Sequence, residues 1–183
     1  MAAVNSNMLE LNTQMPEFNL IDTISGNYID SKTLNKKATV IMFICNHCPF
    51  VLHINEALVK LGEDYENKDV DIIAISSNDV KNYPDDSPEK MKENALNLGY
   101  KFPYLYDETQ EVAKCFMAAC TPDFYLFNSD KKLVYRGQFD NSRPSNTEKV
   151  DGKDLRNAIE AVLNDTNPDK NQIPSIGCNI KWK

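Results

Sequence analysis

Two cysteines stand at a short spacing, Cys45-Asn46-His47-Cys48, between a β-type run and a helix-type segment. The run over residues 38–44 is apolar throughout and rich in β-branched side chains, which is typical of a strand buried on both faces. Pro49 follows at once, and proline is favoured at the first position of a helix. Two thiols at this spacing can form and reopen a disulfide, so the pattern indicates thiol–disulfide redox chemistry.

That chemistry depends on the thiolate, because the thiolate is the species that attacks a disulfide. The pKa of the attacking cysteine must therefore fall toward ambient pH. A helix N-terminus favours this, since its unpaired N–H groups carry partial positive charge. If Pro49 is the first helical residue, Cys48 is the N-cap and receives most of this effect. His47 adds a donor, or a positive charge when it is protonated.

Two simpler interpretations apply to Cys45 and Cys48. Free cysteine is often buried as a small apolar side chain, so the pair could serve packing alone. A Cys-x-x-Cys motif can also be half of a zinc site, but the sequence has no second matched pair. We therefore expect redox chemistry with no metal and no organic cofactor.

Size and charge narrow the class of protein. The chain has 183 residues, which suits one domain with its own core. A formal charge of −7 argues against nucleic-acid or anionic-membrane partners, which require basic surface. No apolar run is long enough to cross a bilayer, and the first residues lack the pattern of a signal peptide. We expect a cytoplasmic protein whose odd number of cysteines, five, reflects catalytic or free thiols.

Hydrophobic periodicity predicts the elements that position the pair. Strands are expected over residues 16–20, 28–30, 38–44, 70–76, 102–105, 124–127 and 132–136, and helices over 49–65, 88–98, 109–116 and 151–163. Ser87 and Gly99 have the residue types that begin and end a helix, and Asp107 with Gln110 resembles a capping box. The order predicts an α/β fold with a mixed central sheet, helices on both faces, an N-terminal β-hairpin and an inserted helix. Residues 1–15 are expected to be a flexible arm, 16–163 the domain, and 164–183 an irregular tail.

With these elements in place, the chain resembles the thioredoxin-fold superfamily. Within it, the chain is similar to thioredoxin-like and peroxiredoxin-like proteins of the alkyl-hydroperoxide-reductase/thiol-specific-antioxidant (AhpC/TSA) group. The resemblance rests on the cysteine pair, on Cys120-Thr121-Pro122 before the hairpin strand, and on the opening segment 16–20 with Gly26. It covers residues 15–163. The run 104–127 and the tail 174–179 look like an uncharacterised subfamily of that group.

The resemblance assigns expected roles around the pair. Pro122 is expected to be cis and to present the Thr121 backbone beside the cysteines, where a partner peptide could pair with it. In thioredoxins the first cysteine attacks, which points to Cys45. In peroxiredoxins the peroxidatic cysteine precedes the helix, which points to Cys48. The choice between the two cysteines is open at this level.

The peroxiredoxin comparison has two departures. Cys45 occupies the position of a threonine that helps to orient the peroxide, and Ile41 stands where a proline is usual. The arginine that such enzymes use would be Arg136 or Arg143. Ile44 also replaces the tryptophan that thioredoxins carry before their first cysteine.

The remaining cysteines have two interpretations each. Cys115 is expected to pack in the core. Cys120 either has an accessory redox role or is buried beside the sheet. Cys178 lies in the tail, where packing is the simpler interpretation and a resolving role, as in some peroxiredoxins, is the alternative.

The sequence thus predicts a thiol–disulfide oxidoreductase that uses Cys45 and Cys48, supported by His47, Thr121 and Pro122. Its partners would be protein or small-molecule disulfides and an external thiol reductant. One alternative is a peroxiredoxin-like thiol peroxidase, an antioxidant enzyme that acts on peroxides through Cys48. Another is a non-enzymatic module that binds peptides on a thioredoxin fold.

Overall fold

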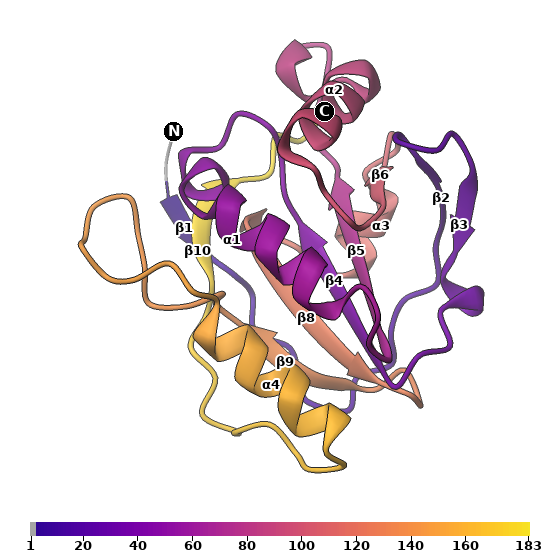
Figure 1. Cartoon of the computed structure of the whole chain (residues 1–183). Coiled ribbons are helices and arrows are strands. Elements are labelled where there is room, and N and C mark those ends of the chain that lie inside the picture. The colour runs from indigo at the N-terminus through magenta and orange to yellow at the C-terminus, as the bar shows by residue number, and fades with distance from the viewer. Residues whose placement is uncertain (1–2) are drawn as a thin grey trace.

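A mixed seven-stranded sheet forms the centre of the molecule (Figure 1) in the computed structural model, which describes residues 3–183. The strand order is β3-β2-β6-β5-β4-β8-β9. The strands are β2 (Asn19–Asp22), β3 (Tyr28–Asp30), β4 (Ala38–Phe43), β5 (Val70–Ser76), β6 (Tyr104–Tyr106), β8 (Asp123–Asn128) and β9 (Leu133–Gly137). The α/β architecture with a mixed sheet and an N-terminal hairpin, β2–β3, is therefore confirmed.

The cysteine pair belongs to a parallel βαβ unit, β4–α1–β5, in which α1 spans Pro49–Tyr65. Every residue of β4 is buried, as its continuous apolar sequence predicts. β5 pairs with one side of β4 and β8 with the other, so β4 is an interior strand. The segment after Phe43 is therefore held by hydrogen-bonded strands on both sides.

Two apolar cores lie on the two faces of this sheet. Alternate β4 residues, such as Val40 and Ile41, point to opposite faces. One core includes side chains of α1, α2 (Pro88–Leu98) and α4 (Lys153–Leu163). The other includes α3 (Glu111–Cys115) and the segment before β2. In Figure 1, α1 and α4 lie in front of the sheet and α3 lies behind it.

Helix α2 begins and ends as predicted. The Ser87 side chain accepts from the N–H of Lys90, and Gly99 ends the helix in the left-handed conformation, φ 81°. Just before α2, a short 3₁₀ turn, η2 (Pro84–Asp86), lies where no helix or strand was predicted. A second short turn, η1 (Ser31–Thr33), follows β3.

Helix α3 differs from the prediction. It spans five residues rather than residues 109–116, because Gln110 before it has a left-handed conformation, φ 64°. The predicted capping box is wrong: Asp107 accepts from the N–H of Ala113, at 2.9 Å, but the Gln110 amide donates elsewhere, to Ser77 and Lys181 carbonyls. In so short a helix Cys115 faces outward and is exposed, so the expectation that it packs in the core is also wrong.

The tail is not irregular throughout. Residues Ile176–Asn179 form a strand, β10, between β1 (Ala3–Asn5) and β7 (Cys120–Thr121) in a separate three-stranded sheet. The N-terminal arm, expected to be flexible, therefore supplies a paired strand, while residues 1–2 lie outside the described part. Backbone pairing of short polar segments leaves no periodic signal, which is why neither strand was predicted. The boundary at residue 163 stays a prediction.

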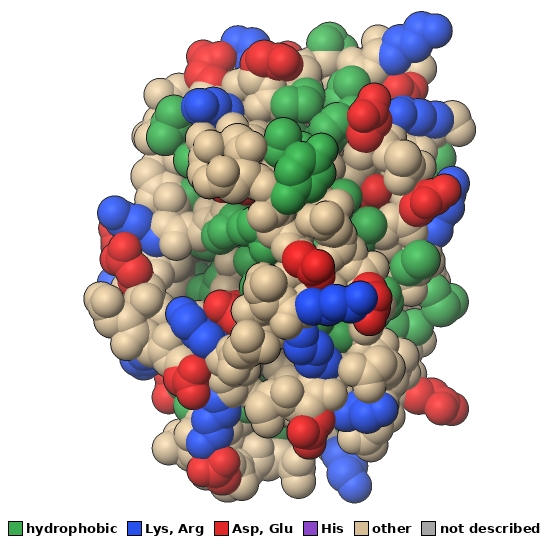
Figure 2. Space-filling view, turned by 90° about the vertical axis from the view of Figure 1, so that its right-hand side faces the viewer, with side chains coloured by type: hydrophobic (Ala, Val, Ile, Leu, Met, Phe, Trp, Pro, Cys, Tyr) green, Lys and Arg blue, Asp and Glu red, His purple; other side chains and the backbone are tan. Residues whose placement is uncertain are grey.

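No helix among the described residues is long and apolar enough to cross a membrane. Figure 2 shows acidic and basic side chains interspersed over one face, with hydrophobic side chains mainly in its upper half. The negative formal charge is therefore not gathered into one patch on this face.

Candidate active site

Cys45 and Cys48 lie at the junction between β4 and α1, where both are buried, 2% and 0% exposed. Cys48 is the N-cap residue of α1, with Pro49 at the first helical position, as predicted. Its carbonyl accepts from the N–H groups of Val51 and Leu52, at 2.9 Å each, while its side chain makes no capping bond. The Cys48 sulfur therefore lies at the positive end of the helix.

The Thr121–Pro122 peptide is cis and lies against the pair. The Cys48 thiol is 3.1 Å from the Thr121 carbonyl oxygen, and the Cys45 sulfur is 3.4 Å from the Thr121 hydroxyl. Thr121, which is distant from the pair in the sequence, thus meets both cysteines as the resemblance implied.

The pKa values of the two thiols are shifted in opposite directions. A hydrogen bond from Cys45 lowers the pKa of Cys48 well below its usual value, and further hydrogen bonds from Cys178 and Thr121 act in the same direction against the effect of burial. The same bond raises the pKa of Cys45, as do burial and the charge of Asp86. Of the two thiols Cys48 is therefore the more acidic, and the pair titrates as a unit.

Asp86, at the end of η2, fixes the loop between the cysteines and was not singled out from the sequence. Its carboxylate is fully buried and accepts from the Asn46 N–H and from the Asn78 side chain, each at 2.8 Å. His47 Nδ1 lies 2.7 Å from the same carboxylate. Hydrogen bonding to Asp86 raises the pKa of His47, which favours a positive charge beside the thiols. No sequence signal distinguishes Asp86 from neighbouring Asp85.

Further contacts hold this loop from outside. Asn46 donates to the Asp85 carbonyl at 2.7 Å and accepts from Asn94 at 3.2 Å. Tyr83 stacks on the His47 ring with 5.4 Å between centroids. The loop is therefore anchored to η2 and to α2.

Among residues 3–183, Cys45, His47 and Asp86 are one group whose donor atoms could hold a metal ion, all within 4.8 Å of one another. Sulfur, nitrogen and oxygen donors would suit zinc. The Asp86 oxygens, however, already accept from Asn46 and Asn78 and face His47. The group is accounted for as a hydrogen-bonded network, and we assign no metal.

Strand β10 brings Cys178 to the same place. Cys178 lies opposite Thr121 in the β10–β7 register, and its thiol and backbone N–H both stabilise the Cys48 thiolate. Burial, followed by interaction with Cys48, raises the pKa of Cys178 to about 11. Cys120 is also buried, and burial raises its pKa, but its sulfur faces the Pro122 carbonyl at 3.6 Å.

Arg136 and Arg143, the two arginines considered for peroxide chemistry, form their hydrogen bonds away from the cysteines. Arg136 is completely buried, donates through both terminal nitrogens to Asp123, and lies 3.8 Å over the Tyr125 ring. Arg143 donates to the carbonyls of Asp140 and Ser142. Among the described residues, neither guanidinium donates to Cys45 or Cys48. Arg136 is therefore a structural residue, and nothing places Arg143 at the thiols.

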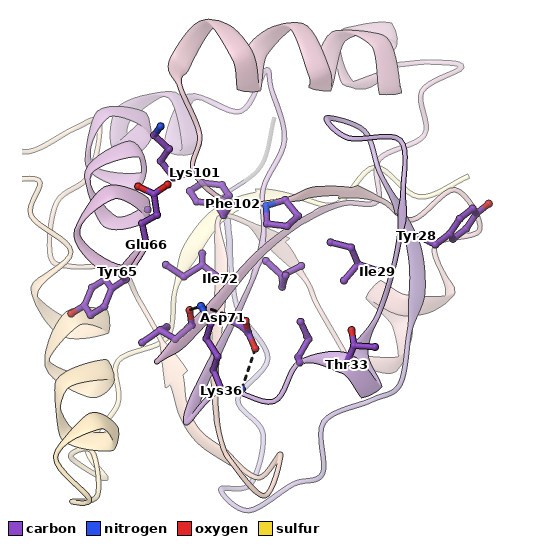
Figure 3. A pocket seen from close by; sticks show the side chains of 15 residues that line it. Tyr28, Ile29, Thr33, Lys36, Tyr65, Glu66, Asp71, Ile72, Lys101 and Phe102 are labelled. Atoms are coloured by element: carbon purple, nitrogen blue, oxygen red, sulfur yellow. Dashed lines mark hydrogen bonds and ion pairs between the residues drawn. The ribbon is translucent and has the colours of Figure 1, made fainter. Parts of the chain in front are cut away.

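A separate pocket of about 320 Å³ lies between β3, the end of α1 and the start of β5. Figure 3 shows Tyr28, Tyr65 and Phe102 around it, with Lys36 reaching toward Asp71. This pocket is at the amino-terminal end of β5, whereas the cysteines follow the carboxyl-terminal end of the parallel strand β4. It therefore takes no part in the cysteine site.

Solved structures with the same fold include two similar chains. An uncharacterised conserved protein from Geobacillus kaustophilus is 56% identical, with a TM-score of 0.98 over 100% of this chain and 97% of that one. A hypothetical protein from Sinorhizobium meliloti is 44% identical, with a TM-score of 0.95 over 98% of each chain. A putative thiol:disulfide interchange protein from Chlorobium tepidum shares the fold at 15% identity, with a TM-score of 0.67 over 85% of this chain and 99% of that one.

A search of curated proteins found no match. The model of the AhpC/TSA family, in contrast, matches residues 11–136, which include the cysteine pair and the Thr121–Pro122 peptide. The described fold is the thioredoxin fold that the sequence predicted. The chain belongs to the AhpC/TSA family.

Proposed function

We propose that the protein is a thiol–disulfide oxidoreductase that exchanges disulfides through Cys45 and Cys48. The observation that carries this is the contact between two buried thiols, at the N-terminus of α1 and against Thr121. Its substrates are thiols or disulfides, and an external thiol reductant completes the cycle. No other cofactor is needed, because the electrons are carried by sulfur.

Cys48 is the attacking sulfur in this mechanism. Its thiolate attacks one sulfur of a substrate disulfide, the substrate S–S bond breaks, and the departing sulfur takes up a proton. The result is a mixed disulfide between Cys48 and the substrate. Cys45 then loses its proton, attacks the Cys48 sulfur and releases the second substrate thiol, so that substrate is reduced and the pair is oxidised to a disulfide.

The supporting groups act on the thiolate. His47 supplies positive charge when protonated, the helix N-terminus supplies partial charge, and Thr121 donates its hydroxyl to the pair. The Thr121 carbonyl, in contrast, accepts from the Cys48 thiol at 3.1 Å in the protonated form.

The reduction potential of the pair tests the proposal. The protein is equilibrated in glutathione buffers of graded ratio, and the thiols are trapped and counted by mass spectrometry. A two-electron couple that peptide mapping assigns to a Cys45–Cys48 disulfide is expected, and that disulfide should be absent in Cys45→Ser and in Cys48→Ser. Cys115→Ser, which changes an exposed cysteine outside the site, should leave the potential unchanged. Absence of a Cys45–Cys48 disulfide at every ratio would refute the proposal.

A thiol peroxidase is the second candidate, favoured by the N-cap position of Cys48. The Cys48 thiolate would attack a peroxide oxygen, giving a sulfenic acid and releasing the other oxygen as water or alcohol. The engagement of Arg136 with Asp123 removes one expected partner for the peroxide. In Cys45→Ser protein treated with hydrogen peroxide, a sulfenate reagent should label Cys48 faster than free cysteine if this candidate is correct.

A further inference from the structure

Strand β10 occupies the backbone edge at Thr121 that we expected to be open to a partner peptide. Cys178 pairs with Thr121 and Asn179 with Cys120, in antiparallel register. The Ser175 hydroxyl donates to the Pro122 carbonyl at 2.8 Å, and the N–H of Ile180 donates to the Ala119 carbonyl at 3.1 Å. The chain's own strand therefore occupies this edge from Ala119 to Pro122.

Gly177 makes this close approach feasible. A Cβ at this buried position would lie 2.0 Å from the Thr121 carbonyl oxygen and 3.0 Å from the Pro122 nitrogen. No real Cβ tolerates the first of these distances, and the obstacle is backbone that cannot rotate away. Only glycine allows β10 to lie this close to the Thr121–Pro122 peptide.

The same strand brings Cys178 beside Cys48. Cys178 is 4% exposed and lies opposite Thr121, whose carbonyl oxygen is 3.1 Å from the Cys48 sulfur. Beyond β10, the N–H of Lys181 donates to Asn78, which itself donates to Asp86, so the tail is tied to the network that holds the cysteine loop. A third thiol is thus held beside Thr121, next to Cys48.

We infer that Cys178, on β10, is the third thiol of the redox centre and that it exchanges disulfide bonds with Cys48. This inference rests on the proposed function. In the step it adds, the Cys178 thiolate attacks Cys48 within the Cys45–Cys48 disulfide. A Cys48–Cys178 bond forms, the Cys45–Cys48 bond breaks, and Cys45 takes up the proton that Cys178 lost. No net oxidation occurs, so no further reactant is needed.

The exchange has a consequence for substrates. While β10 is paired with β7, a second peptide cannot pair with Thr121, and Cys48 is fully buried. A disulfide in a folded protein therefore reaches Cys48 only if β10 is displaced. A Cys48–Cys178 disulfide would tie β10 to the start of α1 and keep this edge closed.

Disulfide mapping in Cys45→Ser protein tests the inference. After equilibration with glutathione disulfide and acid quenching, peptide mass spectrometry should find a Cys48–Cys178 disulfide. Adding Cys178→Ser should leave glutathione on Cys48 instead. The matched control is Cys45→Ser with Cys115→Ser, which should retain the Cys48–Cys178 bond. Glutathione on Cys48 together with a free Cys178 thiol in the Cys45→Ser protein would overturn the inference.

This result is separable from failure of the proposed function. The wild-type protein tests the Cys45–Cys48 couple, and the Cys45→Ser protein tests the partnership of Cys48 with Cys178. If the wild-type couple is present but the second disulfide is not, only the inference falls. If the wild-type couple is absent, the proposed function falls whichever bond Cys178 forms.

A second variant tests the position of β10. Gly177→Ala, in the Cys45→Ser background, should displace the strand and lower the yield of the Cys48–Cys178 disulfide several-fold while circular dichroism shows an intact fold. Ile176→Ala is the control, because it leaves the contact between Gly177 and Thr121 unchanged. An unchanged disulfide yield in the Gly177→Ala protein would contradict the arrangement.

Discussion

Asp86 and His47 face each other beside the cysteine pair, with His47 Nδ1 2.7 Å from a carboxylate oxygen. Asp86 also accepts from the N–H of Asn46, so one buried carboxylate both raises the pKa of His47 and holds the loop that carries it. Asp86 contacts no reacting sulfur through a hydrogen bond of its own and is a positioning residue.

Asp86→Asn should lower the pKa of His47, because the main cause of its raised value is the hydrogen bond to this carboxylate. A raised folded-state pKa stabilises the protein below the unfolded value near 6.5, and that contribution is lost as pH rises through the folded value. The variant should therefore lose this contribution at low pH. NMR titration of the His47 ring measures the pKa directly.

The loss of a buried acceptor should also cost the Asp86→Asn protein about 1–3 kcal/mol in the free energy of unfolding. Asp85→Asn is the matched control, because the Asp85 side chain is exposed and only its carbonyl binds the loop. Equal His47 titration in both variants would contradict the positioning role.

The reduced protein should have one thiolate at a pH well below the usual cysteine range, because hydrogen bonds from Cys45 and then Cys178 and Thr121 lower the pKa of Cys48. Ultraviolet thiolate absorbance against pH measures it. Cys48→Ser should abolish the low-pH step. Cys45→Ala, which removes the first of these donors, should shift the step to higher pH. If the low-pH absorbance step persists in the Cys48→Ser protein, Cys45 is the cysteine that ionises at low pH.

The depressed pKa of Cys48 also predicts how stability of the reduced protein varies with pH. A lowered folded-state pKa stabilises the protein above the unfolded value near 8.5, and the stabilisation is lost as pH falls toward the folded value. As the pH falls, the urea midpoint of the reduced wild-type protein should therefore fall more than the midpoint of the Cys48→Ser protein does. Urea midpoints of the two proteins that change with pH in the same way would contradict this prediction.

Arg136→Met should destabilise the protein by about 3–5 kcal/mol, because it leaves the fully buried Asp123 carboxylate without its partner. Burial already raises the pKa of Asp123 against the effect of Arg136, so the unpaired acid is expected to be protonated. Urea denaturation measures the loss.

Arg143→Met is the control for this substitution, since the Arg143 guanidinium bonds mainly to backbone carbonyls and is only partly buried. Its effect on the midpoint should be clearly smaller. A midpoint for Arg136→Met equal to that of the wild-type protein would show that the ion pair does not stabilise the fold.

Ser87→Ala should destabilise the protein by about 1 kcal/mol, because α2 loses the side chain that accepts at its N-terminus. Thermal unfolding measures the change. Ser129→Ala, at an exposed position in the β8–β9 turn, is the control and should have little effect. Identical melting temperatures for the two variants would contradict the capping role.

The sequence by itself determined the elements whose signals are local. The buried run of β4, the apolar repeat of α1, and Pro49 after Cys48 depend only on residues close in the chain, and they already place Cys48 at a helix N-terminus. The start of α3 at Glu111 was missed because a left-handed residue, Gln110, precedes that helix and no sequence pattern marks it.

Tertiary structure alone brought Asp86 and Cys178 to the cysteines. Asp86 lies in a loop-like segment beside an equivalent Asp85, and Cys178 lies in a polar tail without periodicity. Their positions follow from backbone pairing of β10 with β7 and from hydrogen bonds between segments far apart in the chain. Hydrophobic periodicity predicts which face of a helix or strand is buried. It does not predict which polar groups from distant parts of the chain will contact that element.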